Sequence, residues 1–446
     1  MKFIYLDPGI TTNHGHHANS CRAITRELAK RRIETRIYAH RDIEDGLRAE
    51  LSASPHFESW LYWGDREPLC GWLKTFTTAA ATTCRDIAAI KGITSADIVY
   101  LNSALPGQFM GLLNWLSTLA PADLPTIIVE FGHGPGIDPV GRGNPRPYTT
   151  RDPRCDAKAT LYRYAATAIP KAAKGKLHPV TFEPYCSQLY AKLVQWPVAT
   201  LPALIDRRLP LRQEQKSTRP LTIGILGTQR PEKGYHLVPD IARSVLRQRD
   251  VRFFIHNSGP TWMPAEQEAL KLLASESGRI QLDEGPADGE NWPKILIQAD
   301  IILCPYDPLR YHGSYSAVAV EACAYGIPFV GPADTSIHRL IEQGQGSGGV
   351  FDQQTVELIV AATLDVIDRF PMHSAQAAAA AESWSLKQGA KQTVDAMLAL
   401  ANDTGSGRPL ISDPADPGVT ISGDVYSDIV AAVDPAGWTG GTSAKK

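Results

Sequence analysis

The chain has 446 residues, which is more than one hydrophobic core of ordinary size accommodates, so we expect at least two domains. Its 45 basic and 47 acidic side chains give a formal net charge of −2, and this balance excludes the basic surface that steers nucleic acid. A hydrophobic content of 43% is ordinary for a soluble globular protein.

Seven cysteines are scattered along the chain without a C-x-x-C pair. This odd, unclustered set argues against a disulfide framework and against a structural zinc site. The strand-like run MKFIYLD opens the chain without a signal-peptide pattern, and the longest apolar stretch is too short to span a bilayer. We therefore expect a cytoplasmic protein, either soluble or peripheral on the inner face of the membrane.

The first half alternates strand-like and helical patterns. KFIYL from Lys2, a helical pattern over residues 18–32 and ETRIYAH predict a β-α-β start. The apolar runs DIVYLNS and PTIIVEFGH are typical of buried strands in a parallel sheet, and VTFEP and VATLPALI close this half. Residues 132–153 are rich in Gly, Pro and Arg, which predicts a loop. We assign residues 1–205 to a first Rossmann-like domain.

The second half repeats this pattern after a charged, Pro-bearing segment, 206–220, which we interpret as a linker. LTIGILG, a helix over 236–249, VRFFIHNS, DIILCPY, the helical run SAVAVEACAYG and IPFVGP predict a parallel sheet covered on both faces. The second domain is expected over 221–383 and is followed by a helix over 384–401. The tail, 402–446, has few apolar residues and is expected to be disordered.

The first candidate site is the loop that follows LTIGILG. Ligands of open α/β sheets bind beyond the carboxyl ends of the strands. Here Gly227 and Gly234 flank a loop that presents Arg230 and Lys233. Two cations near the start of a helix suit a diphosphate, because charge-assisted hydrogen bonds add to the helix dipole. The alternative is a solvated turn with ordinary surface charges.

The second candidate site is the loop from Pro305 that leads into SAVAVEACAYG. Ser316 is a candidate N-cap, and Gly326 is a candidate C-terminal stop for this helix. Glu321 lies among apolar neighbours and therefore needs a partner, and a ribose diol offers two donors to one carboxylate. The alternative is a glutamate on the solvent side of the helix.

The run PYDPLRYHGSYSAVAVEACAYGIPFVGP resembles the donor-binding domain of family 4 of the retaining glycosyltransferases, and GILGTQRPEKG resembles the same family's Gly-Arg…Lys-Gly loop. The resemblance implies an α/β GT-B fold, in which two Rossmann-like domains face each other across a cleft and a C-terminal helix crosses back. It also implies transfer of a sugar from a nucleoside-diphosphate sugar to a hydroxyl of a glycan or lipid-linked glycan. Retention of anomeric configuration is part of the implication.

Within this resemblance Lys233 neutralises the donor diphosphate and Glu321 holds the ribose. The amides around Ser316, Ala317 and Val318 face the phosphates. Gly227 and Thr228 open the first loop, but the family's Arg directly follows its first Gly. In this chain that place is Thr228, and Arg230 comes two positions later.

The family also carries a sugar-contacting Glu in the place that Gly313 takes here, eight residues before Glu321. Asp307, Tyr311 or His312 are the candidates to replace it. This departure keeps open a non-catalytic nucleotide-sugar-binding protein. A sugar-nucleotide epimerase or a phosphorylase on the same scaffold is a further alternative.

In the first half, Gly15 within TTNHGHHANS takes the place of the family's glycine loop. His133, after PTIIVEFGH, takes the place of a histidine beside the sugar, and Glu130 is a weaker candidate.

A metal site is the alternative for the histidines His14, His16 and His17. No fourth ligand pattern accompanies them, and the chain has no Asp-x-Asp motif, so we expect no metal and no other cofactor. The aromatic stretches 60–63 and 72–76 indicate core packing or, alternatively, a membrane-facing patch.

Overall fold

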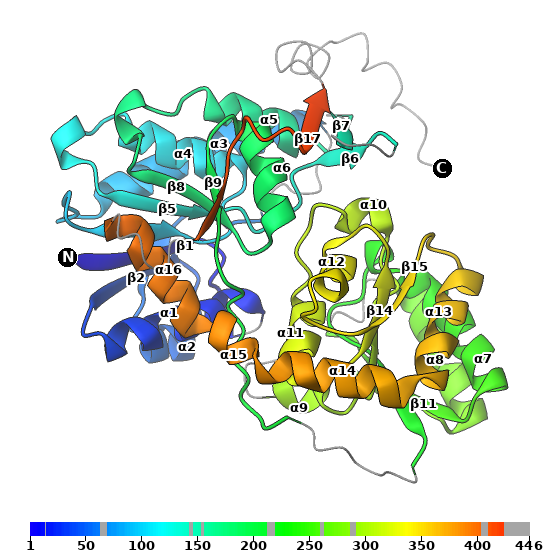
Figure 1. The fold of residues 1–446 in the computed structure, drawn as a ribbon. Helices are drawn as coiled ribbons and strands as arrows, with labels where there is room; N and C mark the ends of the chain where they lie inside the picture. Colours follow the sequence, from blue (N-terminus) through cyan, green and yellow to red (C-terminus); the bar gives the residue numbers. More distant parts are fainter. Residues whose placement is uncertain are drawn as a thin grey trace, which may run out of the picture. The chain divides into compact units, whose positions relative to one another are not determined.

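The computed structural model describes residues 1–13, 15–62, 69–141, 146–152, 156–211, 219–258, 263–285, 291–402 and 409–422. Contacts divide the chain into two compact units. The first contains Met1–Thr12, Leu28–Leu201 and the described residues from Ala396 onward, and the second contains Asn13–Glu27 and Pro202–Asp395. Each unit is built on a mainly parallel sheet with helices packed against it (Figure 1).

The main sheet of the first unit has eight strands in the order β16-β9-β8-β5-β4-β1-β2-β3. All neighbouring strands are parallel except β16 and β9. The strands are β1 (Lys2–Asp7), β2 (Glu34–His40), β3 (Ser54–Phe57), β4 (Ile98–Leu101), β5 (Thr126–Glu130), β8 (Leu177–Thr181), β9 (Val198–Thr200) and β16 (Leu410–Ser412). The strands predicted from KFIYL, ETRIYAH, DIVYLNS and PTIIVEFGH are confirmed.

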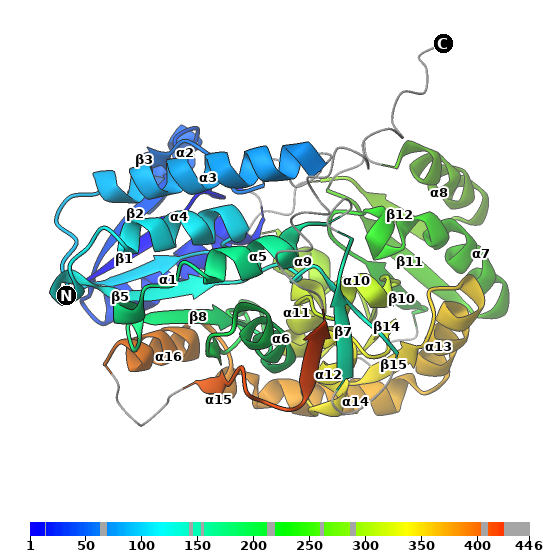
Figure 2. The same cartoon turned by 90° about the horizontal axis from the view of Figure 1, so that it is seen from above.

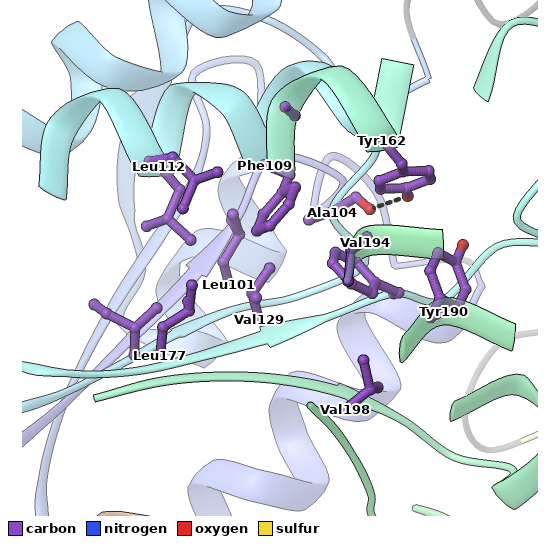
Figure 3. Close-up of a cluster of buried hydrophobic side chains, with 14 of the residues drawn as sticks. Leu101, Ala104, Phe109, Leu112, Val129, Tyr162, Leu177, Tyr190, Val194 and Val198 are labelled. Atoms are coloured by element: carbon purple, nitrogen blue, oxygen red, sulfur yellow. Dashed lines mark hydrogen bonds between the residues drawn. The ribbon is translucent and has the colours of Figure 1, made fainter. Parts of the chain in front are cut away.

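Four helices pack on one face of this sheet, as Figure 2 shows for α3, α4 and α5: α3 (Leu69–Ala89), α4 (Pro106–Leu116), α5 (Lys158–Ala166) and α6 (Pro184–Val194). In their shared core, Phe109 and Leu112 pack against the sheet residues Leu101 and Val129 (Figure 3). The buried Tyr162 hydroxyl donates to the Ala104 carbonyl at 2.7 Å, so this polar group is satisfied within the core. This unit also contains α2 (Asp45–Leu51) and the last residues, from Leu28, of α1 (His16–Lys30), whose residues up to Glu27 belong to the second unit.

Two sequence predictions are wrong in this unit. The expected loop over 132–153 contains β6 (Ile137–Pro139) and β7 (Arg146–Thr150). The tail expected to be disordered contains β16 and β17 (Val419–Ser422), whereas residues 423–446 lie outside the described part. β17 pairs with β7 and β16 pairs with β9. These short strands gain hydrogen bonds from segments distant in sequence, which local composition does not reveal.

The sheet of the second unit has six parallel strands in the order β12-β11-β10-β13-β14-β15. They are β10 (Leu221–Ile225), β11 (Val251–His256), β12 (Ile280–Asp283), β13 (Ile301–Leu303), β14 (Phe329–Pro332) and β15 (Gly348–Phe351). The predictions from LTIGILG, VRFFIHNS, DIILCPY and IPFVGP are confirmed. β12 and β15 were not predicted.

Successive strand residues point to opposite faces of this sheet, and each face carries its own core. Ile223 and Ile225 pack on the face covered by α7 (Val238–Gln248), α8 (Pro264–Ser277) and α13 (Val356–Asp368). Phe254 and Ile302 pack on the opposite face. That face is covered by α9 (Trp292–Leu296), α11 (Ala317–Tyr325) and α12 (Ser336–Glu342), and Figure 1 shows the two groups of helices.

The final helix expected over 384–401 is two helices, α15 (Trp384–Lys387) and α16 (Ala390–Asn402), so the prediction of one continuous helix is wrong. They follow α14 (Phe370–Glu382), which packs against α11. Gly389 breaks the helix with a φ of 110°. A Cβ at Gly389 would lie 2.6 Å from Asp206 Oδ1, and that oxygen accepts a hydrogen bond from Ala390 N at 2.9 Å. Only glycine fits this backbone and this close approach.

The segment interpreted as a linker begins close to the second unit. Arg207 Nη1 donates to the Ala381 carbonyl at 3.3 Å, and Arg208 N donates to the Tyr325 hydroxyl at 2.9 Å. Residues 212–218 lie outside the described part. Among the helices that the structure describes, none has the length and hydropathy needed to cross a membrane.

Candidate functional site

The loop after β10 packs closely against the start of α11. Gly227 has a φ of 97°, and a Cβ there would lie 3.5 Å from Lys233 Nζ and 3.9 Å from Val318 Cγ2. The Lys233 ammonium therefore lies over the backbone of Gly227, beside the first turn of α11. The structure brings together the two loops that the sequence singled out separately.

A second glycine holds this loop against the one that follows β13. Gly234 has a φ of 72°, and a Cβ there would meet the Pro305 carbonyl oxygen at 1.9 Å. Asp307 N donates to the Glu232 carbonyl at 3.0 Å across the same junction. The short helix that ends at Lys233 is thus fixed against the loop that follows β13. That loop continues through α10 (Pro308–Tyr311) toward α11.

Lys233 is the central cation of this cluster. Burial of its ammonium, together with the charge of the neighbouring Arg230, lowers its pKa to about 8. The ammonium lies 5.6 Å from the centroid of the Tyr306 ring, within reach of a cation–π interaction. Arg230 Nε lies 3.0 Å from Glu232 Oε1. An anion placed here would relieve the repulsion between the two cations.

The N-terminus of α11 supplies backbone donors to the same place. Ser316 is its N-cap, and the Ser316 hydroxyl accepts from Ala319 N at 3.4 Å, as the sequence predicts. Gly326, with a φ of 66°, ends the helix, also as predicted. The backbone N–H groups of Ala317 and Val318 lie in the first turn, where no carbonyl of the helix itself can accept from them, and Ala317 is exposed. These donors and the helix dipole favour a negative group.

Glu321 lies one turn further along α11 and is half-buried. Burial raises its pKa to about 7, although a hydrogen bond from Trp292 and the charges of Arg208 and Lys233 lower it. Trp292 Nε1 donates to Glu321 Oε2 at 2.5 Å. Trp292 was missed by sequence reasoning, because a contact across 29 residues leaves no local pattern.

His256, at the end of β11, is a second residue that the sequence analysis missed. Its side chain is fully buried, and its Nδ1 accepts from Gly227 N at 3.3 Å. Its Nε2 lies 2.8 Å from the Gly285 carbonyl, so this nitrogen carries the hydrogen. Neutral His256 therefore ties the glycine loop to the segment after β12. The only sequence signal was its position at the end of a predicted strand.

Three residues were candidates to replace the sugar-contacting Glu of the family, whose place Gly313 takes here. Each of them has contacts of its own in the structure. Asp307 caps α10 by accepting from Leu309 N at 2.9 Å. Tyr311 is buried, with its ring centroid 4.4 Å from that of Tyr306. His312 is buried as well, and its carbonyl accepts from Arg339 Nη2 at 2.9 Å. Gly313 lies in the turn before α11.

In the first unit, His133 follows the carboxyl end of β5. Its carbonyl accepts from the Tyr190 hydroxyl at 2.6 Å, and its ring packs edge-on against Tyr62 at a centroid distance of 5.4 Å. The backbone at His133 is therefore anchored to α6, and its ring is steadied by an aromatic neighbour.

A buried polar chain runs across the carboxyl ends of β1, β4 and β5. Asp7 Oδ2 accepts from Asn102 Nδ2 at 2.7 Å. The Tyr100 hydroxyl lies 3.0 Å from Asn102 Oδ1 and 2.6 Å from Glu130 Oε2. The single hydroxyl hydrogen of Tyr100 serves only one of these two contacts at a time. The Glu130 carboxyl group is thus held in place by this hydrogen-bonded chain.

The remaining sequence candidates lie near the N-terminus. Gly15 has a φ of 88°, is exposed, and belongs to the second unit by its contacts. His14 lies outside the described residues, and the rings of His16 and His17 are 4.2 Å apart. Within the part of the chain that the structure describes, no three metal-ligating side chains come together.

The aromatic stretch around residue 60 is of mixed exposure. Trp60 is 44% exposed, whereas Leu61 is buried, and the rings of Trp60 and Tyr62 lie 5.1 Å apart. The side chains of Trp63 and Trp72 lie outside the described part. The described residues thus divide between core packing and the surface.

Sequence comparison finds no family model that matches the chain and no similar curated protein. Solved structures do match it. The Anabaena protein Alr3699/HepE in complex with UDP has a TM-score of 0.59 at 14% identity, with 91% of this chain and 100% of that chain covered.

Sucrose-phosphate synthase from Thermosynechococcus elongatus has a TM-score of 0.62 at 13% identity, with 90% and 99% covered. A putative UDP-N-acetylglucosamine 2-epimerase from Listeria monocytogenes has a TM-score of 0.54 at 13% identity, with 92% and 100% covered. At these identities the similarity concerns the fold. The chain has the GT-B fold, with two Rossmann-like α/β units.

Proposed function

We propose that the protein is a glycosyltransferase that moves a sugar from a nucleoside-diphosphate sugar to a hydroxyl of a glycan or lipid-linked glycan. The observation that carries this proposal is the convergence of Lys233, Gly227 and the N-terminus of α11. Alr3699/HepE, a structure with the same fold, has been solved with UDP and with UDP-glucose, which supports a sugar nucleotide as the donor.

The chemistry of such a transfer matches these groups. When the bond between sugar and diphosphate breaks, negative charge builds on the leaving diphosphate. Lys233, Arg230 and the amides of Ala317 and Val318 would stabilise that charge more strongly in the transition state than in the ground state. A metal ion is not needed for this step, because the cations and helix dipole supply the positive potential. Thr228 and Ser316 would line the diphosphate side.

The nucleoside would be recognised through Glu321, whose carboxylate accepts hydrogen bonds from the ribose hydroxyls. We assign Gly313 to the sugar side of the donor. The family resemblance implies that His133 and Gly15 also contact the donor. We assign acceptor binding to residues 1–205 and donor binding to residues 221–383. Retention of anomeric configuration follows from the family resemblance and belongs to the same proposal.

An epimerase is the second candidate function. It is favoured by the similarity to a putative UDP-N-acetylglucosamine 2-epimerase and by glycine at position 313, where an acid would contact a transferred sugar. An epimerase converts the donor without an acceptor, whereas a transferase releases the nucleoside diphosphate and forms a new glycosidic bond.

The test is incubation with UDP-glucose and a panel of other sugar nucleotides, with and without oligosaccharide and lipid-linked acceptors. A transferase releases UDP only when acceptor is present, and NMR of the product shows an α-linkage from an α-donor. Conversion of the sugar nucleotide without acceptor would establish the epimerase instead. Donor binding without any turnover across the panel would contradict both enzymes.

A further inference from the structure

Trp292 is a component of the second unit's site that neither the sequence pattern nor the proposed chemistry assigns. It is the first residue of α9 and is half-buried against the core beneath α11. Its indole N–H points to Glu321 rather than to a backbone carbonyl, and the distance of 2.5 Å from Nε1 to Oε2 is short. Such a contact is typical of a charge-assisted hydrogen bond to a carboxylate.

We infer that Trp292 is a positioning residue for ribose recognition: its N–H fixes Oε2 of Glu321, so that Oε1 accepts from the ribose diol. The inference rests on the proposed function. Among the described residues, no hydrogen bond reaches Glu321 Oε1. A carboxylate oxygen accepts two hydrogen bonds, so the two hydroxyls of one diol match its free capacity.

The ring itself is held in place. The rings of Trp292 and His256 meet edge-on at a centroid distance of 5.9 Å. His256 is bonded in turn to Gly227 N and to the Gly285 carbonyl. The orientation of Glu321 is therefore coupled through two aromatic rings to the glycine loop on which Lys233 lies. Rings fixed in this way hold a hydrogen bond at little cost in conformational entropy.

The hydrogen bond also selects the charge state of Glu321. An indole N–H only donates, so it stabilises the carboxylate and not the protonated acid. Burial drives the pKa of Glu321 upward, and the groups that oppose burial are Trp292, Arg208 and Lys233. Loss of the indole N–H would remove one of the groups that counter burial, so the pKa of Glu321 would rise. Glu321 would then carry a proton at neutral pH and accept less well from a diol.

The test compares the full-length wild-type protein with Trp292→Phe, which keeps a ring and removes the N–H. Trp384→Phe is the matched control, since the Trp384 N–H donates to the Ile205 carbonyl at 3.1 Å in the same unit. Calorimetry gives the Kd for UDP, 2′-deoxy-UDP and pyrophosphate, each over a pH series. The unfolding midpoint of each variant verifies that it is folded.

We expect Trp292→Phe to weaken UDP binding by about tenfold, as for loss of a hydrogen bond to a charged group. The preference for UDP over 2′-deoxy-UDP should fall to about twofold, and pyrophosphate binding should stay unchanged. The acid limb of UDP binding should move to higher pH in this variant, and Trp384→Phe should retain the wild-type values.

Two results would overturn the inference. The first is that Trp292→Phe and Trp384→Phe show the same preference for UDP over 2′-deoxy-UDP and the same pH profile of UDP binding. This result would contradict the inference and leave the proposed function intact. If the wild-type protein binds pyrophosphate but gains nothing from the nucleoside, the ribose contact is wrong, and the proposed donor class is contradicted as well.

Discussion

The two sheets share a β-α-β design, but the residues at their carboxyl ends differ in charge. In the second unit, Lys233 and the start of α11 present cations and backbone donors. In the first unit, Asp7, Asn102 and Glu130 form a buried chain rich in oxygen acceptors. The cations and amide donors of the second unit suit a diphosphate better than the oxygen acceptors of the first unit do. The same fold thus presents different polar groups at the carboxyl ends of its two sheets.

The largest effect should come from removing the central cation of the second unit. Lys233→Ala should lower the transfer rate by on the order of 10³-fold, because a preorganised charge at the leaving diphosphate is lost. It should also weaken UDP binding. Lys271→Ala is the control, since Lys271 pairs with Glu268 on the surface. Steady-state kinetics check this, and a loss below threefold would show that the cationic edge is not the diphosphate site.

The next effect tests how the two loops of this edge are held together. Gly234→Ala should destabilise the protein by about 3 kcal/mol, because the backbone is left-handed and Pro305 O occupies the space. Gly278→Ala is matched, with a φ of 62° and open space around its Cβ, and should cost only about 1 kcal/mol. Urea unfolding measures both. Equal losses would mean that the close approach to Pro305 does not matter.

The comparison is sharpened by a change in the first unit. His133→Ala should lower kcat by about tenfold, as expected for a side chain that contacts the sugar or its acceptor, and leave the Kd for UDP unchanged. Initial rates and calorimetry separate the two quantities. A weakened UDP affinity with normal kcat would place His133 on the donor side and blur the division between the units.

The smallest effect concerns pH. Lys233, with a pKa of about 8, loses its charge as the pH rises above 8, and Glu321, with a pKa of about 7, is neutralised as the pH falls below 7. UDP affinity should therefore be highest between these values and fall roughly threefold one unit beyond either side. Calorimetry in matched buffers checks this. Lys233→Met should remove the basic limb and Glu321→Gln the acid limb; if both limbs persist in both variants, other groups control binding.

Much of the second unit could be predicted from sequence, because its signals are local. Apolar runs bounded by turn residues predicted β10, β11, β13 and β14, and Ser316 and Gly326 predicted the two ends of α11. The glycine loop could be recognised because its cations follow a strand directly.

What could not be predicted depends on distant partners. β15 begins with two glycines, and β16 and β17 lie in a polar tail, so their pairing is fixed by segments elsewhere in the chain. The same reason hid Trp292 and His256, which act through contacts with Glu321 and Gly227. Roles at the sugar-facing side remain predictions for the same reason.

The central claim is that the carboxyl edge of the second sheet, and not that of the first, binds the nucleoside diphosphate. Hydrogen–deuterium exchange of the full-length protein with and without saturating UDP tests it most directly, since a bound ligand slows the exchange of the amides it orders. Protection should concentrate in residues 226–237 and 313–321, with no change in residues 100–104 or 128–133. Protection confined to the first unit's segments would contradict the account.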